Sequence, residues 1–176
     1  MSSLRDALRA GEKLPVEIET LVDFAAAHDG ALAGDLELVD DGASAMLAWF
    51  SDRAEPASQF FAFGRDGTGA LFAIWRRGDT LSDSPVVFLG NEGETIVLAG
   101  TPREFLGLLA YGVEDLGFTD WEEEPPQPEG DARAVALRAF LREKLGVEML
   151  PRPADVVLRA REEHPDLESF VLKAIA

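Results

Sequence analysis

The stretch FFAFGRDGTGALFAIW, residues 60–75, places two apolar runs on either side of a polar, glycine-rich centre. Within this centre, Asp66-Gly67 favours a two-residue hairpin turn, because both residues accept the positive φ angles that such turns require. A phosphate-binding loop would instead need a helix directly after the glycines and a Lys-Ser or Lys-Thr pair. ALFAIW has the composition of a strand and the pair is missing, so the stretch predicts a β-hairpin.

The strand pattern continues beyond this hairpin. Short apolar segments at 85–89 and 95–99 are separated by GNEGE, residues 90–94, which supplies a second set of turn residues. This rhythm is typical of a β-meander. GDLELVD, residues 34–40, alternates apolar and acidic residues, as a half-exposed strand does.

Two helices are predicted from their spacing and end signals. LPVEIETLVDFAAAHDG, residues 14–30, has apolar residues at helical intervals and predicts a helix from about residue 15 to 28. In TPREFLGLLAYG, Thr101 is suited to cap a helix, Glu104 completes a capping box and Gly112 is suited to end the helix. GASAMLAWF, residues 42–50, fits a short helix or a strand equally well.

Taken in order, the helix closed near HDG, the pair FFAFGRDGTGALFAIW, the strand SPVVFLGNEGE and the following TPREFLGLL resemble the SUKH superfamily. This superfamily includes fungal glucan-synthesis regulators and many bacterial immunity proteins. The resemblance covers about residues 12–111, although Asp29-Gly30 stands where many relatives carry Asn-Gly. It implies an α+β domain with a mainly antiparallel twisted sheet of about five strands and packed helices. It also implies protein binding, commonly of a toxin, without a catalytic residue.

The remainder of the chain suggests three parts. Residues 1–117 are expected to form the SUKH-like α+β domain, and residues 118–130, rich in Glu and Pro, an exposed linker. Residues 131–176 carry helical apolar stripes and predict a C-terminal helical extension. Because FFAF and ALFAIW are apolar at nearly every position, both faces of their strands are expected to be buried, and the extension is expected to pack on the domain.

Charge and composition narrow the classes of partner. The chain has 16 Lys and Arg against 33 Asp and Glu, a formal net charge of −17. Such a surface repels nucleic acid and anionic lipid and attracts basic proteins. The sequence has no cysteine, no long apolar run and no apolar signal core near its first residues. We therefore expect a cytoplasmic protein with a basic protein partner, and the oligomeric state stays open.

Catalytic and metal chemistry find little support in the sequence. His28 and His164 each stand near a predicted helix end, where a histidine commonly complements the helix dipole. A transition-metal site would need both histidines brought together from distant segments. No serine lies in a nucleophile-elbow pattern. We expect no enzyme activity, no metal and no cofactor.

The candidate site lies in the predicted linker, at Asp120, Trp121, Glu122, Glu123 and Glu124. An exposed aromatic residue ringed by carboxylates is typical of an interaction hot spot that faces a basic surface. In the alternative interpretations, the run of glutamates is only solvated, or Trp121 and Phe118 attach the linker to the core. The expected function is a non-catalytic binding module, an immunity-type protein that neutralises a basic toxin. The alternative is a structural or regulatory interaction protein unrelated to toxins.

Overall fold

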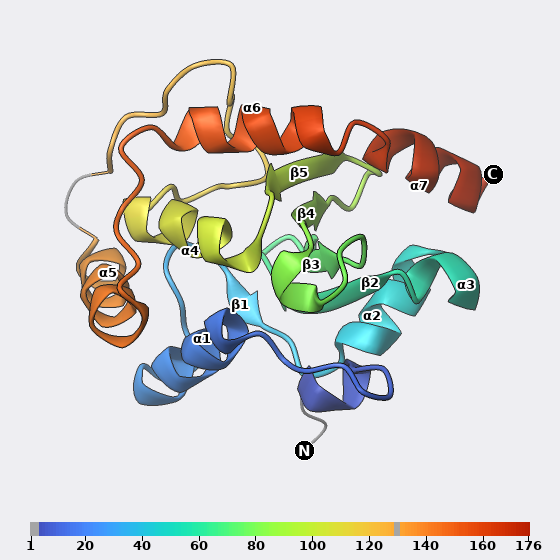
Figure 1. Ribbon diagram of the computed structural model, residues 1–176, viewed down its shortest axis with the longest axis horizontal. Helices are drawn as coiled ribbons and strands as arrows, with labels where there is room; N and C mark the ends of the chain where they lie inside the picture. The colour runs from blue at the N-terminus through green and yellow to red at the C-terminus, as the bar shows by residue number, and fades with distance from the viewer. Residues whose placement is uncertain (1–3, 129–130) are drawn as a thin grey trace.

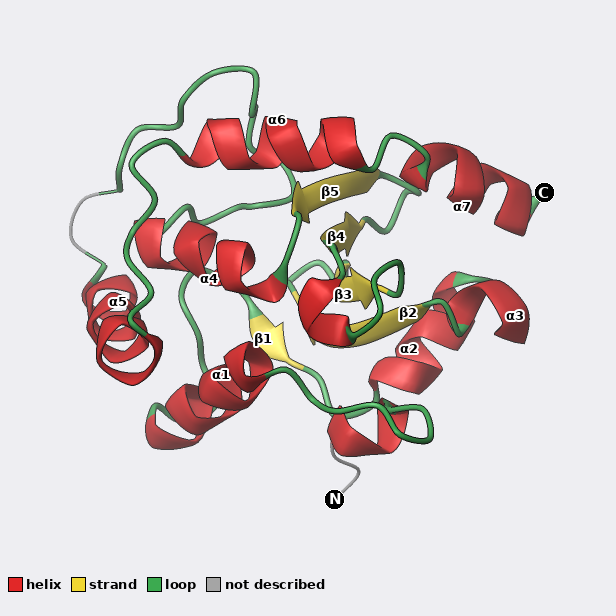
Figure 2. Ribbon diagram, viewed as in Figure 1, coloured by secondary structure: helices red, strands yellow, loops and turns green. Residues whose placement is uncertain are grey.

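A five-stranded antiparallel sheet with the strand order β1-β2-β3-β4-β5 forms the centre of the molecule (Figures 1 and 2). The computed structural model describes residues 4–128 and 131–176, so Glu129 and Gly130 of the predicted linker and residues 1–3 lie outside the described residues. The α+β fold class is confirmed. The strands are β1 (Glu37–Leu38), β2 (Phe60–Arg65), β3 (Leu71–Trp75), β4 (Val86–Leu89) and β5 (Thr95–Ala99).

Helical segments flank the sheet, and both predicted helices are present. GASAMLAWF, which fitted a helix or a strand, forms a helix. GDLELVD contributes only the two residues of β1, shorter than predicted. The helical segments are η1 (Leu4–Ala7), α1 (Val16–Ala27), α2 (Gly42–Trp49), α3 (Ala54–Ala57), η2 (Leu81–Asp83), α4 (Pro102–Tyr111), α5 (Ala132–Leu145), α6 (Pro153–Glu163) and α7 (Leu167–Ile175).

Helices bury both faces of the sheet. Because side chains alternate along a strand, Phe61 and Phe63 pack in one apolar cluster with residues of α1, α4 and α5. Phe60 and Trp75 point the other way and pack with residues of α2 and α7. The helix α6 lies along the edge strand β5 (Figure 1). This two-sided burial explains why FFAF and ALFAIW lack polar residues.

The hairpin between β2 and β3 is present, but its turn differs from the predicted one. Arg65 pairs with Leu71, so five residues rather than two make the connection. The Oδ1 atom of Asp66 accepts hydrogen bonds from the Thr68 N–H (2.9 Å), the Thr68 hydroxyl (2.7 Å) and the Ala70 N–H (3.0 Å). Gly69, at φ +91°, takes the left-handed conformation that was expected at Asp66-Gly67. The side chain of Asp66 therefore closes a longer turn, and the two-residue prediction is wrong.

The ends of α1, α4 and α6 follow their sequence signals. Thr101 Oγ1 accepts a hydrogen bond from the Glu104 N–H (3.3 Å), and the Glu104 carboxylate accepts one from the Gly100 N–H (2.9 Å). Gly112 ends α4 at φ +93°. His28 and His164 are the C-terminal cap residues of α1 and α6, as the structural interpretation of both histidines predicted.

Candidate interaction surface

The predicted hot-spot residue Trp121 lies in the core, and the prediction that it is exposed is wrong. Its side chain is 1% exposed and packs in the cluster on the α1, α4 and α5 side of the sheet. Its indole N–H donates a hydrogen bond to the Leu116 carbonyl over 3.2 Å. Burial of a large aromatic side chain stabilises the fold. This stabilisation favours the conformation of the preceding loop that places the Trp121 indole in the core.

The acidic neighbours of Trp121 are exposed, as expected, but two of them make ion pairs within the molecule. Glu122 lies 3.9 Å from Arg161, and Glu124 lies 4.0 Å from Arg152. Glu123 and Asp120 form no ion pair among the described residues. The two contacts tie residues 122–124 to α6 and to the residue that precedes it.

A buried tyrosine holds the next part of the segment. The Tyr111 hydroxyl donates a hydrogen bond to the Pro125 carbonyl over 2.7 Å. Burial raises the pKa of Tyr111, and the negative charge of Glu124 raises it further. In its described residues, the predicted linker is therefore held against the surface of the domain by these contacts.

The exposed aromatic residue of this region is Phe118, three positions before Trp121. Its side chain is 56% exposed, while one edge of its ring packs on Phe88 with the ring centres 5.6 Å apart. The carboxylate of Asp115 accepts a hydrogen bond from the Phe118 N–H over 3.2 Å. Gly117 packs so closely on the Phe88 ring that a Cβ atom there would lie 2.3 Å from it. Phe118 is therefore presented to solvent by an ordered loop.

Four loops contact one another at one end of the sheet, and we call them the turn surface: residues 34–36, 66–69, 90–94 and 114–120, the last of which contains Phe118. The Gly67 N–H donates a hydrogen bond to Asp35 over 3.3 Å, and the Asn91 amide donates one to the Thr68 carbonyl. A Cβ atom on Gly34 would lie 2.7 Å from the Glu114 carbonyl oxygen. An antiparallel meander brings alternate turns to the same end of a sheet, so segments distant in sequence form one surface.

Negative charge dominates the turn surface. Its four segments contain no lysine or arginine, although Arg65 is exposed beside them. Burial raises the pKa of Asp115 and the negative charges of Asp35 and Asp66 raise it further, against the opposing hydrogen bond from the Phe118 N–H. The carboxylates of Asp35, Asp66 and Asp115 are therefore close enough to repel one another electrostatically. The exposed acidic residues of the turn surface are Asp35, Glu92, Glu114, Asp115 and Asp120.

The sequence indicates Phe118 only as an attachment of the linker to the core, and not as an exposed contact residue. The available signal was a pair of aromatic residues, Phe118 and Trp121, in a segment with few other apolar residues. Only one of them enters the core, and the local pattern did not identify which. The other acidic loops of the turn surface are brought to Phe118 by the sheet topology, which local sequence patterns do not encode.

Comparisons with known proteins add no relative: no family model matches the chain, and neither a curated protein nor a solved structure matches it. The resemblance to the SUKH superfamily therefore stays a prediction. Among the described residues, no three acidic or histidine side chains are grouped so that they could hold a metal ion. No helix in the described part of the chain has both the length and the apolar character needed to cross a bilayer.

Proposed function

We propose that the chain is a non-catalytic binding module whose turn surface binds a basic protein. The observation that carries this proposal is the exposed ring of Phe118 on a surface whose loops carry exposed carboxylates, with Asp115 hydrogen-bonded to the Phe118 N–H. Aromatic side chains are enriched among the residues that dominate binding energy, and surrounding polar groups exclude water from the contact. The proposal therefore assigns to Phe118 the role that the sequence suggested for Trp121.

Charge supports a basic partner. A chain with a formal net charge of −17 attracts a basic protein over distance and accelerates its encounter. On contact, an arginine or lysine side chain could lie on the exposed ring of Phe118, a cation–π interaction worth about 0.5–1 kcal/mol at an exposed site. Carboxylates such as Glu114 and Asp115 would then pair with neighbouring cations of the partner.

The partner class we propose is a basic toxin that the chain neutralises as an immunity-type protein. The support is the resemblance to the SUKH superfamily, whose bacterial members commonly have this role, together with the acidic turn surface. A structural or regulatory interaction protein would use the same surface with an unrelated partner. The two roles differ in whether the bound protein is toxic to a cell without the chain.

The test is affinity capture from the native cell with the wild-type chain and a Glu92→Lys/Glu114→Lys variant. Neither glutamate side chain makes a hydrogen bond or ion pair among the described residues, so the double variant should fold normally. A Glu162→Lys/Glu168→Lys variant is the matched control, with the same charge change at two exposed glutamates of α6 and α7. A basic protein captured by the wild type and the control, but lost in the turn-surface variant, is expected.

Two outcomes would count against the proposal, and they differ. Equal capture by both variants would show that the turn surface is not the binding site. A captured protein that is harmless when produced alone would contradict the immunity role while leaving the binding surface in place. Growth of cells that produce the captured protein, with and without the chain, distinguishes these cases.

A further inference from the structure

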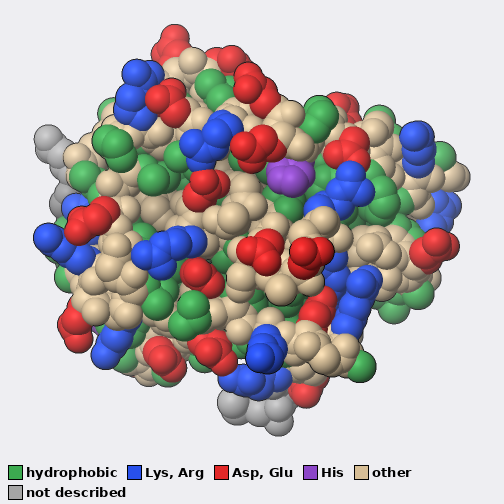
Figure 3. Space-filling view, in the orientation of Figure 1, with side chains coloured by type: hydrophobic (Ala, Val, Ile, Leu, Met, Phe, Trp, Pro, Cys, Tyr) green, Lys and Arg blue, Asp and Glu red, His purple; other side chains and the backbone are tan. Residues whose placement is uncertain are grey.

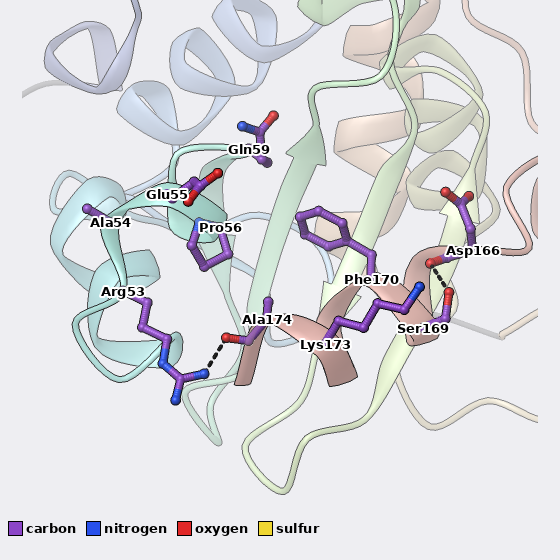
Figure 4. Close-up of a pocket in the computed structure, with 10 residues that line it drawn as sticks. All are labelled: Arg53, Ala54, Glu55, Pro56, Gln59, Asp166, Ser169, Phe170, Lys173 and Ala174. Atoms are coloured by element: carbon purple, nitrogen blue, oxygen red, sulfur yellow. Dashed lines mark hydrogen bonds between the residues drawn. The ribbon is translucent and has the colours of Figure 1, made fainter. Parts of the chain in front are cut away.

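A cleft that resembles a ligand-binding site lies on the face of the sheet opposite to Trp121. This cleft, of about 750 Å³, lies between α3 and α7, within the size range of small-molecule sites. Figure 4 shows Pro56 and Gln59 on one wall and Phe170 and Lys173 on the other. The residues that line this cleft include none of the turn surface.

The cleft has an aromatic floor that the core holds in place. The Phe170 ring lies 5.9 Å from the ring centre of Phe60 and 5.6 Å from that of Trp75. Phe60 and Trp75 are themselves stacked, with their ring planes 9° apart. Phe170 is only partly buried, so one side of its ring remains open to the cleft. A flat apolar group could pack there without any rearrangement of the core.

Cations stand at the rim of this floor. Lys173 forms no ion pair among the described residues, and the guanidinium of Arg53 donates a hydrogen bond to the carbonyl oxygen of Ala174. Asp166 is neutralised by its ion pair with Arg77, which also lies over the Trp75 ring. In Figure 3, hydrophobic side chains gather beside Lys and Arg side chains over α7, at the right of the view. The lining of the cleft has two basic residues, Arg53 and Lys173, and two acidic residues, Glu55 and Asp166. Because Asp166 is paired with Arg77, the ammonium group of Lys173 is left to pair with a ligand.

The side chains on the α3 side of the cleft determine which end of a ligand can face them. Glu55 and Gln59 have no side-chain partner among the described residues, and Figure 4 places them across the cleft from Lys173. The Lys173 side chain extends along α7 toward Ser169 and Asp166. A negative group is thus favoured beside Lys173 and disfavoured beside Glu55.

We propose that the α3–α7 cleft binds a small carboxylate with an aromatic body. The body packs on Phe170 and Pro56, and the carboxylate pairs with the ammonium group of Lys173. A neutral ligand of the same shape would lose the ion pair, and a cationic ligand would be repelled by Lys173. This site is independent of the proposed binding of a basic protein.

The probe is phenylbutyrate, titrated at constant ionic strength while amide ¹H–¹⁵N spectra of the full chain are recorded. A ligand of about a dozen non-hydrogen atoms is expected to bind with a Kd of about 1 mM. The amide signals of Ser169, Phe170 and Ala174 should shift. Phenylbutyramide, the uncharged analogue, should bind about threefold more weakly, as expected for the loss of one exposed ion pair.

The matched variants are Lys173→Gln and Lys144→Gln, both replacing an exposed helix lysine. Lys173→Gln should raise the Kd for phenylbutyrate about threefold and abolish the preference over phenylbutyramide. Lys144→Gln should leave both unchanged. Shifts confined to residues outside the cleft, equal affinity for the two probes, or a Lys173→Gln variant that behaves like wild type would each overturn the proposal.

Discussion

Phe118 and Trp121 lie three positions apart on one loop and have opposite environments, with Phe118 56% exposed and Trp121 1% exposed. The indole N–H of Trp121 donates a hydrogen bond to the carbonyl of Leu116 in the same loop, whereas the Phe118 ring is largely exposed to solvent. Trp121 therefore anchors the loop, and Phe118 is available for contact with a partner. The two residues can be tested separately.

Trp121→Ala should lower the free energy of unfolding by about 3–5 kcal/mol, because it removes a large buried side chain and leaves a cavity. Phe118→Ala should change the free energy of unfolding by less than about 1 kcal/mol, since most of its side chain is already in water. Urea unfolding of both variants measures the difference. A Trp121→Ala protein as stable as wild type would show that the indole does not anchor the loop.

Gly69→Ala should destabilise the protein by about 1 kcal/mol or more, because Gly69 has φ +91° and alanine is strained there. Gly67→Ala is the matched control in the same turn. A Cβ atom on Gly67 meets only the Asp35 carboxylate at 3.6 Å, an ordinary contact, so its cost should be small. Thermal unfolding of the two variants checks this order. The reverse order would support a two-residue turn at Asp66-Gly67.

Truncation after Gly130 should expose core and abolish cooperative unfolding, because α5, α6 and α7 supply buried residues on both faces of the sheet. Leu137 and Leu141 lie in one apolar cluster, and Leu167 and Val171 lie in the other. Each large apolar side chain is worth about 1.5–3 kcal/mol when buried. Differential scanning calorimetry should show no sharp transition for the truncated chain. An unchanged, sharp transition would mean that these helices do not support the sheet.

Glu12→Gln should lower stability at neutral pH and have little effect in acid. The Arg76 guanidinium donates hydrogen bonds to both carboxylate oxygens of Glu12, at 2.7 and 2.9 Å. Burial raises the pKa of Glu12, but the hydrogen bonds from Arg76 and from the Arg9 N–H outweigh it and hold the pKa below its ordinary value. A lowered carboxyl pKa stabilises the fold above the unfolded pKa, and this stabilisation is lost as the pH falls through the folded pKa.

The expected loss for Glu12→Gln is about 1–3 kcal/mol at pH 7, the usual range for hydrogen bonds to a charged group. The difference from wild type should begin to shrink below the ordinary Glu pKa of about 4.3, where the unfolded carboxyl becomes protonated, and should vanish as the pH falls through the lowered pKa of the folded protein. Urea unfolding across this pH range measures it. A difference that stays constant with pH would show that the Glu12 charge does not contribute.

Local sequence patterns predicted the sheet, the β2–β3 hairpin and the helix α4, because each depends on short-range signals such as Thr101 with Glu104. Apolar residues on both sides of the strands also predicted burial of both faces. The length of the β2–β3 turn was predicted wrongly. The side chain of Asp66 stabilises the turn by accepting hydrogen bonds, whereas the prediction assigned Asp66 a positive φ angle in the backbone of a two-residue turn. The exposed residue of the candidate site was missed because Phe118 and Trp121 compete for one place in the core, and tertiary packing decides between them.

The most direct test of the proposed function is the affinity of the captured partner for Phe118→Ala, compared with Val135→Ala. Val135 is also a largely exposed apolar residue, at 54%, but it lies on α5 away from the turn surface. Calorimetric titration should show that Phe118→Ala weakens binding by about 2 kcal/mol or more, the threshold for a hot-spot residue, while Val135→Ala binds like wild type. Equal affinity of the two variants would contradict a binding site centred on Phe118.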